Sequence, residues 1–364
     1  MSDVQNGRCM ASWRGLVMAL VVTFVVPASA ETIDPNKNYT YLYFENGYPT
    51  RMVGRRSQDE ADRAARANPD LVVQTGYYSL KLDCDDMALT GYDALEGSDY
   101  ITALNEDVTV FSPANFSLTM IKDGRQYNCM RARIQDQTHQ YVRLIESGQF
   151  VQRFDHLGLI FSTNDRAVPD VYGRLEVTAW ADHVVFKLDL TGVSGVTQTA
   201  IKLTSPSGKL HQSTAPSDHA LLVLQPHLDQ RLDWGRVSSC LREAIDLQTQ
   251  KMLAYHFDED EAALHIDVPA DRVTYPKDAN RVDEYVIEVH NSMETSCNIP
   301  FVFDQVVPRA ITGTVMTLCE DTDGRPTGIP VQISKNWHRD KDHPTVHEGS
   351  WLRGYTLLPM AAGE

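Results

Sequence analysis

Short stretches of alternating apolar and polar residues, separated by turn signals, constrain the fold of this chain more than any other feature. Residues 175–179 (LEVTA) place an apolar side chain at every second position, and residues 184–190 (VVFKLDL) do the same. Residues 181–183 (ADH) lie between them. Because successive side chains of a strand point to opposite faces, the two stretches predict a hairpin with one buried face.

The same pattern recurs along most of the chain. It predicts two more hairpins, one formed by residues 141–146 and 150–154, the other by residues 201–203 and the segment around Leu210. Further strands are predicted at residues 221–224, 264–268, 285–289, 311–319 and 330–334. So many short strands predict a mainly β chain, folded as a large antiparallel β-sandwich. In layout it resembles the β-supersandwich of many polysaccharide-acting enzymes, a likeness of fold alone because no family motif accompanies it.

One or two peripheral helices are expected beside the strands. Ser57 and Glu60 have the spacing of a capping box, and Asn68-Pro69 ends the helix that it would begin. A second helix is predicted over residues 239–251, where Leu241, Ala244, Ile245 and Gln248 would share one side.

The N-terminus reads as a cleaved secretory signal. Arg8 and Arg14 precede an apolar run of eleven residues, 16–26, and Ala28-Ser29-Ala30 offers a cleavage site. As a helix, this run would rise about 16 Å, too short for a hydrocarbon core of about 30 Å. We therefore expect a signal peptide over residues 1–30 and a β-sandwich domain over residues 31–364. The mature protein would be secreted or periplasmic, with no insertion into a membrane.

The mature chain would be strongly acidic. Of 33 basic and 49 acidic residues, the signal removes Arg8, Arg14 and Asp3, which leaves 31 basic and 48 acidic residues. Phosphate recognition needs clustered Lys and Arg, and the sequence has no such cluster. Nucleic acid is therefore excluded as a partner, and no sequence feature indicates an oligomeric state.

Five cysteines remain after the signal, and export permits disulfides. The preferred pairs are Cys297–Cys319, which closes a short loop, and Cys84–Cys129, with Cys240 left unpaired. Each pair would stabilise the fold by about 3–4 kcal/mol. The alternative is that all five are buried thiols.

Residues 335–351 (KNWHRDKDHPTVHEGSW) concentrate histidines and acids between two tryptophans. Aromatic rings stack on the apolar faces of sugars, and a pair of carboxylates can act as acid and base on a glycosidic bond. The predicted catalytic residues are His338, Asp340, Asp342 and His343. The predicted sugar contacts are Asn336, Trp337, Arg339, Trp351, Arg353 and Tyr355. The plainer alternative is an exposed connection between two strands.

Metal sites are weaker alternatives in the sequence. His338, His343 and His347 would form a zinc site if they converged on one ion. Residues 256–261 (HFDEDE) and 320–324 (EDTDG) offer oxygens for calcium, but each reads better as a turn. No cofactor is expected, with calcium or zinc as the alternatives.

Three functions follow from these patterns. The first is an exported protein that binds or acts on a polysaccharide or oligosaccharide, as the substrate-positioning part of a glycoside hydrolase or polysaccharide lyase. The second is a non-enzymatic structural or adhesion module that pairs through edge strands. The third is a metal-dependent hydrolase. The strand-like residues 355–359 lie near the end of the sequence. Either the domain ends on an edge strand, or the chain is the N-terminal part of a longer protein, which is the alternative we favour.

Overall fold

Strands dominate the fold, which confirms the predicted mainly β, sandwich-like class. A computed structural model of the protein describes residues 35–45, 70–83, 88–94, 116–129, 141–163, 166–204, 210–216, 218–224, 239–246, 249–268, 285–292, 294, 296–306, 318–320, 325–334 and 351–364. The described residues include a 3-10 turn, η1 (Pro35–Lys37), and Ser239, which is α-helical. None of the helices in this part of the chain is long and apolar enough to cross a membrane.

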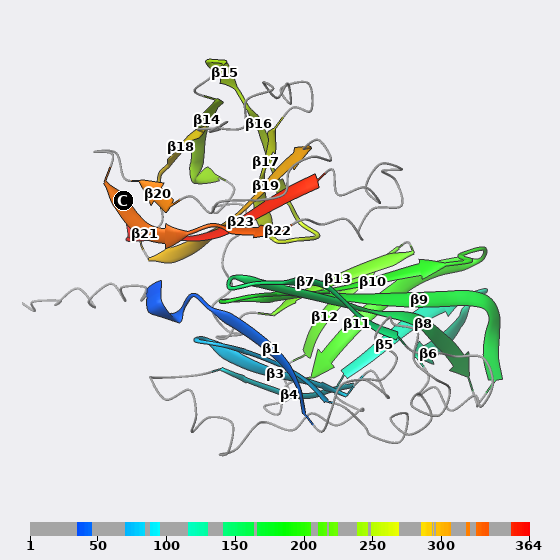
Figure 1. Cartoon of the computed structure of the whole chain (residues 1–364). Coiled ribbons are helices and arrows are strands. Elements are labelled where there is room, and N and C mark those ends of the chain that lie inside the picture. Colours follow the sequence, from blue (N-terminus) through cyan, green and yellow to red (C-terminus); the bar gives the residue numbers. More distant parts are fainter. Residues whose placement is uncertain are drawn as a thin grey trace, which may run out of the picture.

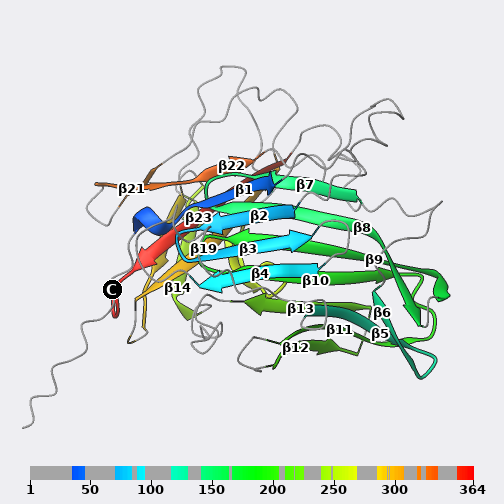
Figure 2. The ribbon, with the colours of Figure 1, turned by 90° about the horizontal axis from the view of Figure 1, so that it is seen from below.

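A first sandwich is built from a four-stranded and a nine-stranded sheet (Figures 1 and 2). The four-stranded sheet has the order β1 (Thr40–Glu45), β2 (Asp70–Thr75), β3 (Tyr78–Asp83) and β4 (Ala88–Ala94). The nine-stranded sheet has the order β12-β11-β5-β6-β8-β9-β10-β13, with β7 paired to β8. Its strands are β5 (Phe116–Lys122), β6 (Arg125–Cys129), β7 (Tyr141–Ser147), β8 (Val151–Thr163), β9 (Arg166–Trp180), β10 (Val184–Thr191), β11 (Val196–Thr204), β12 (Leu210–Ala215) and β13 (His219–Leu224).

Apolar side chains from both sheets fill the space between them. Leu80 and Leu82 of β3 share this core with Phe154 of β8 and Phe186 of β10. The predicted hairpin of residues 175–190 is confirmed, because β9 and β10 pair with Val177 opposite Phe186. Its alternation therefore did identify the buried face.

A second, smaller sandwich follows in the chain (Figure 1). A three-stranded sheet has the order β15 (Lys251–Met252), β14 (Leu241–Asp246) and β18 (Tyr285–Val289). A five-stranded sheet has the order β16 (Ala254–Asp258), β17 (Ala263–Val268), β19 (Cys297–Val306), β23 (Trp351–Met360) and β22 (Gln332–Ser334). A separate pair comprises β20 (Leu318–Glu320) and β21 (Pro326–Pro330). Leu264, Ile266, Phe301 and Leu241 lie in the core between these two sheets.

The helix predicted over residues 239–251 is wrong. The segment forms β14, a turn and β15, and Ile245 pairs with Met252 on one side and Val286 on the other. The Asp246 carboxylate accepts hydrogen bonds from the backbone N–H and the hydroxyl of Thr249, which closes the turn. A short apolar run fits either periodicity, and the cross-strand partners decided it. The helix predicted from Ser57 lies outside the described residues.

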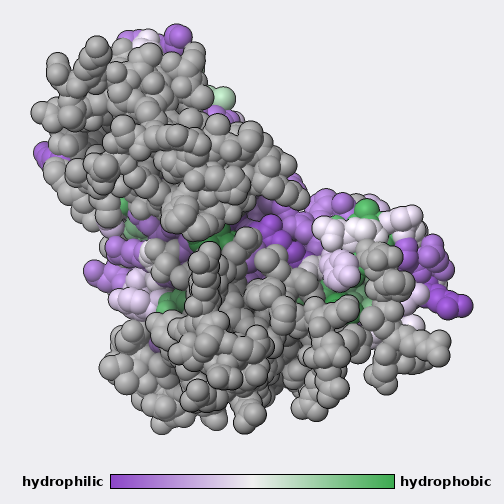
Figure 3. Space-filling model, turned by 45° about the vertical axis from the view of Figure 1, so that its right-hand side comes forward, coloured by the Kyte–Doolittle hydropathy of each residue, from purple (hydrophilic) through white to green (hydrophobic). Residues whose placement is uncertain are grey.

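The two sandwiches meet at a junction of eight buried side chains. The first sandwich contributes Phe150, Val151, Trp180 and Ala181, and the second contributes Ala263, Val302, Tyr355 and Leu357. The rings of Trp180 and Tyr355 meet edge to face, with centroids 5.9 Å apart. On one side of the molecule, the described surface between the sandwiches is mostly hydrophilic (Figure 3). On this face, the described residues beside the apolar junction are mostly polar.

Candidate metal centre

Most residues of the predicted sugar site lie outside the described part of the chain. This holds for Asn336, Trp337, His338, Arg339, Asp340, Asp342 and His343, and for His347 of the predicted zinc site. Trp351 begins β23, but its side chain is also outside the description. The flanking strands are described, since Ser334 of β22 pairs with Arg353 of β23. The ends of the predicted connection are therefore adjacent in one sheet.

The two predicted sugar contacts that the structure describes are buried at the junction. Tyr355 has 0% of its surface exposed, which leaves no ring face for a sugar. Burial raises the pKa of its hydroxyl far above the usual range. Arg353 is 7% exposed, and its Nη1 donates to Glu261 Oε1 at 2.8 Å. These placements give Arg353 and Tyr355 a structural role in place of the predicted sugar contact.

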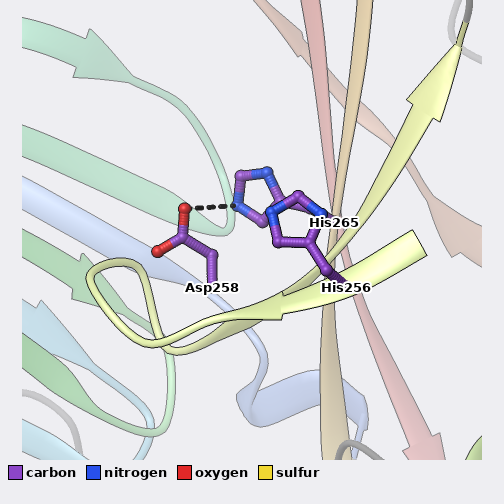
Figure 4. A group of neighbouring side chains, drawn as sticks. All are labelled: His256, Asp258 and His265. Atoms are coloured by element: carbon purple, nitrogen blue, oxygen red, sulfur yellow. Dashed lines mark ion pairs between the residues drawn. The ribbon is translucent and has the colours of Figure 1, made fainter. Parts of the chain in front are cut away.

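The described residues do bring together a different group, on the hairpin of β16 and β17. His256 and His265 are direct cross-strand partners, and Asp258 lies two residues after His256. Residues two apart on a strand share a face, and so do direct cross-strand partners. The register therefore places His256, Asp258 and His265 on one face, and we call them the hairpin triad (Figure 4).

The turn of this hairpin is held by Asp258 itself. Its Oδ1 accepts hydrogen bonds from the backbone N–H of Asp260 at 2.8 Å and of Glu261 at 3.2 Å. These bonds leave Oδ2 facing His265, at 3.8 Å from Nε2. One carboxylate thus shapes the turn with one oxygen and faces the triad with the other.

The three ligand atoms of the hairpin triad lie within 4.8 Å of one another. The two imidazole rings have centroids 5.3 Å apart and an interplanar angle of 34°. The exposure of the triad is graded, because the side chain of His256 is 53% exposed and that of His265 only 5%. Asp267, on β17, places Oδ2 at 3.5 Å from Nδ1 of His256. If Asp267 holds Nδ1–H, Nε2 is the nitrogen that His256 offers to an ion.

Two imidazoles and one carboxylate form a donor set that suits zinc and other transition-metal ions better than calcium, which prefers oxygen. Tetrahedral zinc with bonds of about 2.0–2.2 Å needs ligand atoms roughly 3.3–3.6 Å apart. The triad therefore has to contract by roughly 1 Å around an ion, within the reach of side-chain rotation. The residues present fit a three-ligand site with a coordination position left open.

Behind the triad, Glu261 connects the hairpin to both sandwiches. Its Oε1 accepts hydrogen bonds from Arg153 Nη1 of β8 at 2.7 Å and from Arg353 Nη1 of β23 at 2.8 Å. Its Oε2 lies 3.1 Å from His265 Nε2. Burial opposes the ionisation of Glu261, but the charges of the two arginines and the bond from His265 hold its pKa well below the usual range.

The ion pairs continue into the first sandwich. Arg153 also binds Glu176, which accepts a second bond, at 2.6 Å, from Arg174. Arg174 in turn donates to Asp155 at 2.7 Å. Together with Arg353 and Glu261, this set contains three arginines and three carboxylates, so its charges balance. Such a network resists being broken, because removing one member leaves a buried charge without its counter-charge.

Sequence reasoning missed the hairpin triad although its signal was present. Residues 256–261 were interpreted as a solvated turn or a calcium loop, and His265 was assigned to the next strand without reference to them. The pattern His-x-Asp, then six residues, then His spans β16 and β17, of which only residues 264–268 were predicted as a strand. Pairing those strands as a hairpin would have placed His265 opposite His256.

No family model, curated protein or solved structure matches this chain. Its function is therefore inferred from its own residues. The hairpin triad is the group of described side chains whose types and spacing fit a metal ion. It carries the functional argument below.

Proposed function

We propose that this protein binds a divalent transition-metal ion, with zinc as the best fit, through His256, Asp258 and His265. The observation that carries the proposal is the cross-strand register, which holds both imidazoles and the carboxylate on one face with their ligand atoms within 4.8 Å. The sequence also suggested a metal site, but with His338, His343 and His347 as ligands. The proposal keeps the metal ion and assigns it to ligands on the hairpin of β16 and β17.

The surroundings of the triad support the proposal. Histidine ligands are commonly oriented by a carboxylate, and here Asp267 lies beside His256 and Glu261 beside His265. His265 is anchored in the buried part of the hairpin, and His256 keeps access to solvent. One side of the group is therefore fixed and the other is open to an incoming ion.

Isothermal titration of zinc into the purified, metal-stripped protein tests the proposal. We expect about one ion per chain, with binding lost in His256→Ala and His265→Gln and strongly weakened in Asp258→Asn, because three ligands define the site. His219→Ala is the matched control, since His219 is an exposed strand histidine outside the triad. Zinc binding that survives all three triad substitutions would contradict the proposal.

We further propose that the chain is exported and that it binds or acts on a polysaccharide. Its support is the sequence alone: the signal-like residues 1–30 and the aromatic and acidic residues 335–351. A metal ion on the second sandwich is compatible with this, because a Lewis acid can serve a hydrolase. A non-enzymatic adhesion module remains the alternative, and zinc binding alone does not separate the two.

Disulfides belong to the same proposal of export. No disulfide joins Cys129, Cys240 and Cys297 to one another, the cysteines whose side chains the structure describes. The predicted pair Cys84–Cys129 stays a prediction, since the side chain of Cys84 is outside the described part of the chain. Cys297 is a free thiol in the structure, which argues against the predicted pair Cys297–Cys319. Burial, and then the neighbouring Cys240, raise the pKa of the Cys297 thiol to about 12.

Cys297 is expected to be inert in the folded protein. Cys297 is 3% exposed, its pKa is raised, and only the thiolate is a good nucleophile. In a reductant-free preparation, iodoacetamide should leave Cys297 unmodified in buffer and modify it in urea, as peptide mapping would show. If Cys297 reacts in urea only after a reductant is added, it is in a disulfide, and the structure's free thiol is refuted.

A further inference from the structure

We infer that the metal ion and Glu261 compete for one atom, Nε2 of His265, so that ion binding removes a hydrogen bond from the residue that ties the two sandwiches together. This inference rests on the proposed metal site and adds its regulation. Metal binding to the hairpin triad would then change the hydrogen bonds of Glu261 at the junction.

The competition follows from the position of one nitrogen. Nε2 of His265 lies 3.1 Å from Glu261 Oε2 and 3.8 Å from Asp258 Oδ2. An ionised carboxylate only accepts hydrogen bonds, so Nε2 must carry a proton when it binds Glu261. An imidazole nitrogen must lose its proton to bind a metal ion. The two interactions of Nε2 are therefore mutually exclusive.

Glu261 is the acceptor in its bond with His265. Its other oxygen, Oε1, already accepts from Arg153 at 2.7 Å and from Arg353 at 2.8 Å, and guanidinium groups can only donate. Without an ion, Nε2 of His265 therefore carries the proton that it donates to Glu261 Oε2. When an ion binds with Asp258, that proton leaves Nε2, a bond from Nε2 to the metal forms, and the ring that binds the metal carries its proton on Nδ1.

Loss of the hydrogen bond between His265 and Glu261 would affect the turn that carries Glu261. Asp258 holds the turn through Oδ1 and faces the triad through Oδ2, so an ion pulls on the same residue that shapes the turn. Trp180 Nε1 of the first sandwich donates to the backbone carbonyl of Glu261 at 3.2 Å. Lys187 of β10 pairs with Asp260 of the same turn. Three strands of the first sandwich, β8, β9 and β10, therefore contact this one turn.

Long-range ¹H–¹⁵N correlation of the imidazole groups tests the inference on the full chain. His265 is assigned by comparison with His265→Gln, and zinc is the probe. We expect the Nε2–H tautomer in metal-stripped protein and the Nδ1–H tautomer after one equivalent of zinc, with the signals of His219 unchanged. The inference is overturned if zinc binds and His265 keeps Nε2–H, or if the metal-stripped protein already has the Nδ1–H form.

Asp258→Asn provides a variant that preserves the turn. Asparagine keeps an oxygen for the two turn amides, and an amide is a poorer metal ligand than a carboxylate. We expect the Nε2–H tautomer of His265 to be retained in this variant with and without one equivalent of zinc. A tautomer change equal to that of the unmodified protein would show that Asp258 is not the competing ligand. If zinc does not bind the unmodified protein at all, titration calorimetry shows this independently, and the proposed function fails together with the inference.

Discussion

Replacing Glu261 by alanine is expected to lower the free energy of unfolding by about 3–5 kcal/mol. The side chains of Arg153 and Arg353 are 2% and 8% exposed, and both donate to Glu261 Oε1. Without the carboxylate, two buried guanidinium groups lose a shared counter-charge and cannot regain water. Arg153 keeps its ion pair with Glu176. Urea unfolding followed by circular dichroism measures the loss.

Asp260→Ala is the matched control, one residue away in the same turn. Asp260 pairs with Lys187, but its side chain is 43% exposed, and exposed ion pairs contribute about 0–1 kcal/mol. A loss of stability confined to Glu261→Ala supports the buried network. Equal losses in the two variants would show that the turn, and not the buried charge, stabilises the junction.

Acid is expected to destabilise the protein from about pH 6.5 downward through His156. This residue on β8 is 1% exposed, and neither ring nitrogen has a hydrogen-bond partner among the described residues. Burial lowers its pKa from 6.5 to about 3. Between these values the unfolded chain binds a proton that the folded protein does not bind. Stability is therefore full above pH 6.5 and falls by about 4–5 kcal/mol as the pH approaches 3.

His156→Leu separates this effect from the titration of carboxylates. Leucine removes a buried polar group without partners, so stability at pH 7.5 should rise by about 1–3 kcal/mol. Between pH 6.5 and 4.5, the free energy of unfolding should depend less steeply on pH in the variant. The decrease in slope should correspond to about one proton fewer taken up on unfolding. Glu261, whose lowered pKa also favours the folded state, loses its contribution below this window. Urea unfolding at several pH values tests the prediction, and parallel slopes in the two proteins would refute it.

Much of the fold was readable from the sequence because a half-buried strand has a strict period of two. The pattern in residues 175–190 identified the face that packs in the first core, and β9 and β10 confirm it. The period failed at residues 239–251, where Ala244 and Ile245 fit a helix as well as a strand. There the pairing of β14 with β15 and β18 decided the structure. β15 is close to β14 in the sequence, but β18 is distant from it. The division into two sandwiches was not visible, since it depends on which strands pair.

The candidate site was harder to predict because its chemistry is divided between strands. A linear reading favours residues that are close in sequence, which is why residues 335–351 stood out. The hairpin triad became visible only once His265 was paired with His256. Arg353 and Tyr355 were taken as surface groups because nothing in the neighbouring sequence showed that the first sandwich packs over them. Glu261 was read as one acid of a solvated run, and its two arginines lie about 90 and 110 residues away in the sequence.

The most direct measurement of the central claim is an anomalous difference map from zinc-loaded crystals, collected at the zinc absorption edge. A peak within about 2.0–2.2 Å of His256, Asp258 and His265 is the predicted result. In the same map, His265 Nε2 should point to the ion and no longer to Glu261. A zinc peak among His338, His343 and His347 with none at the hairpin of β16 and β17 would contradict the account and restore the site first suggested by the sequence.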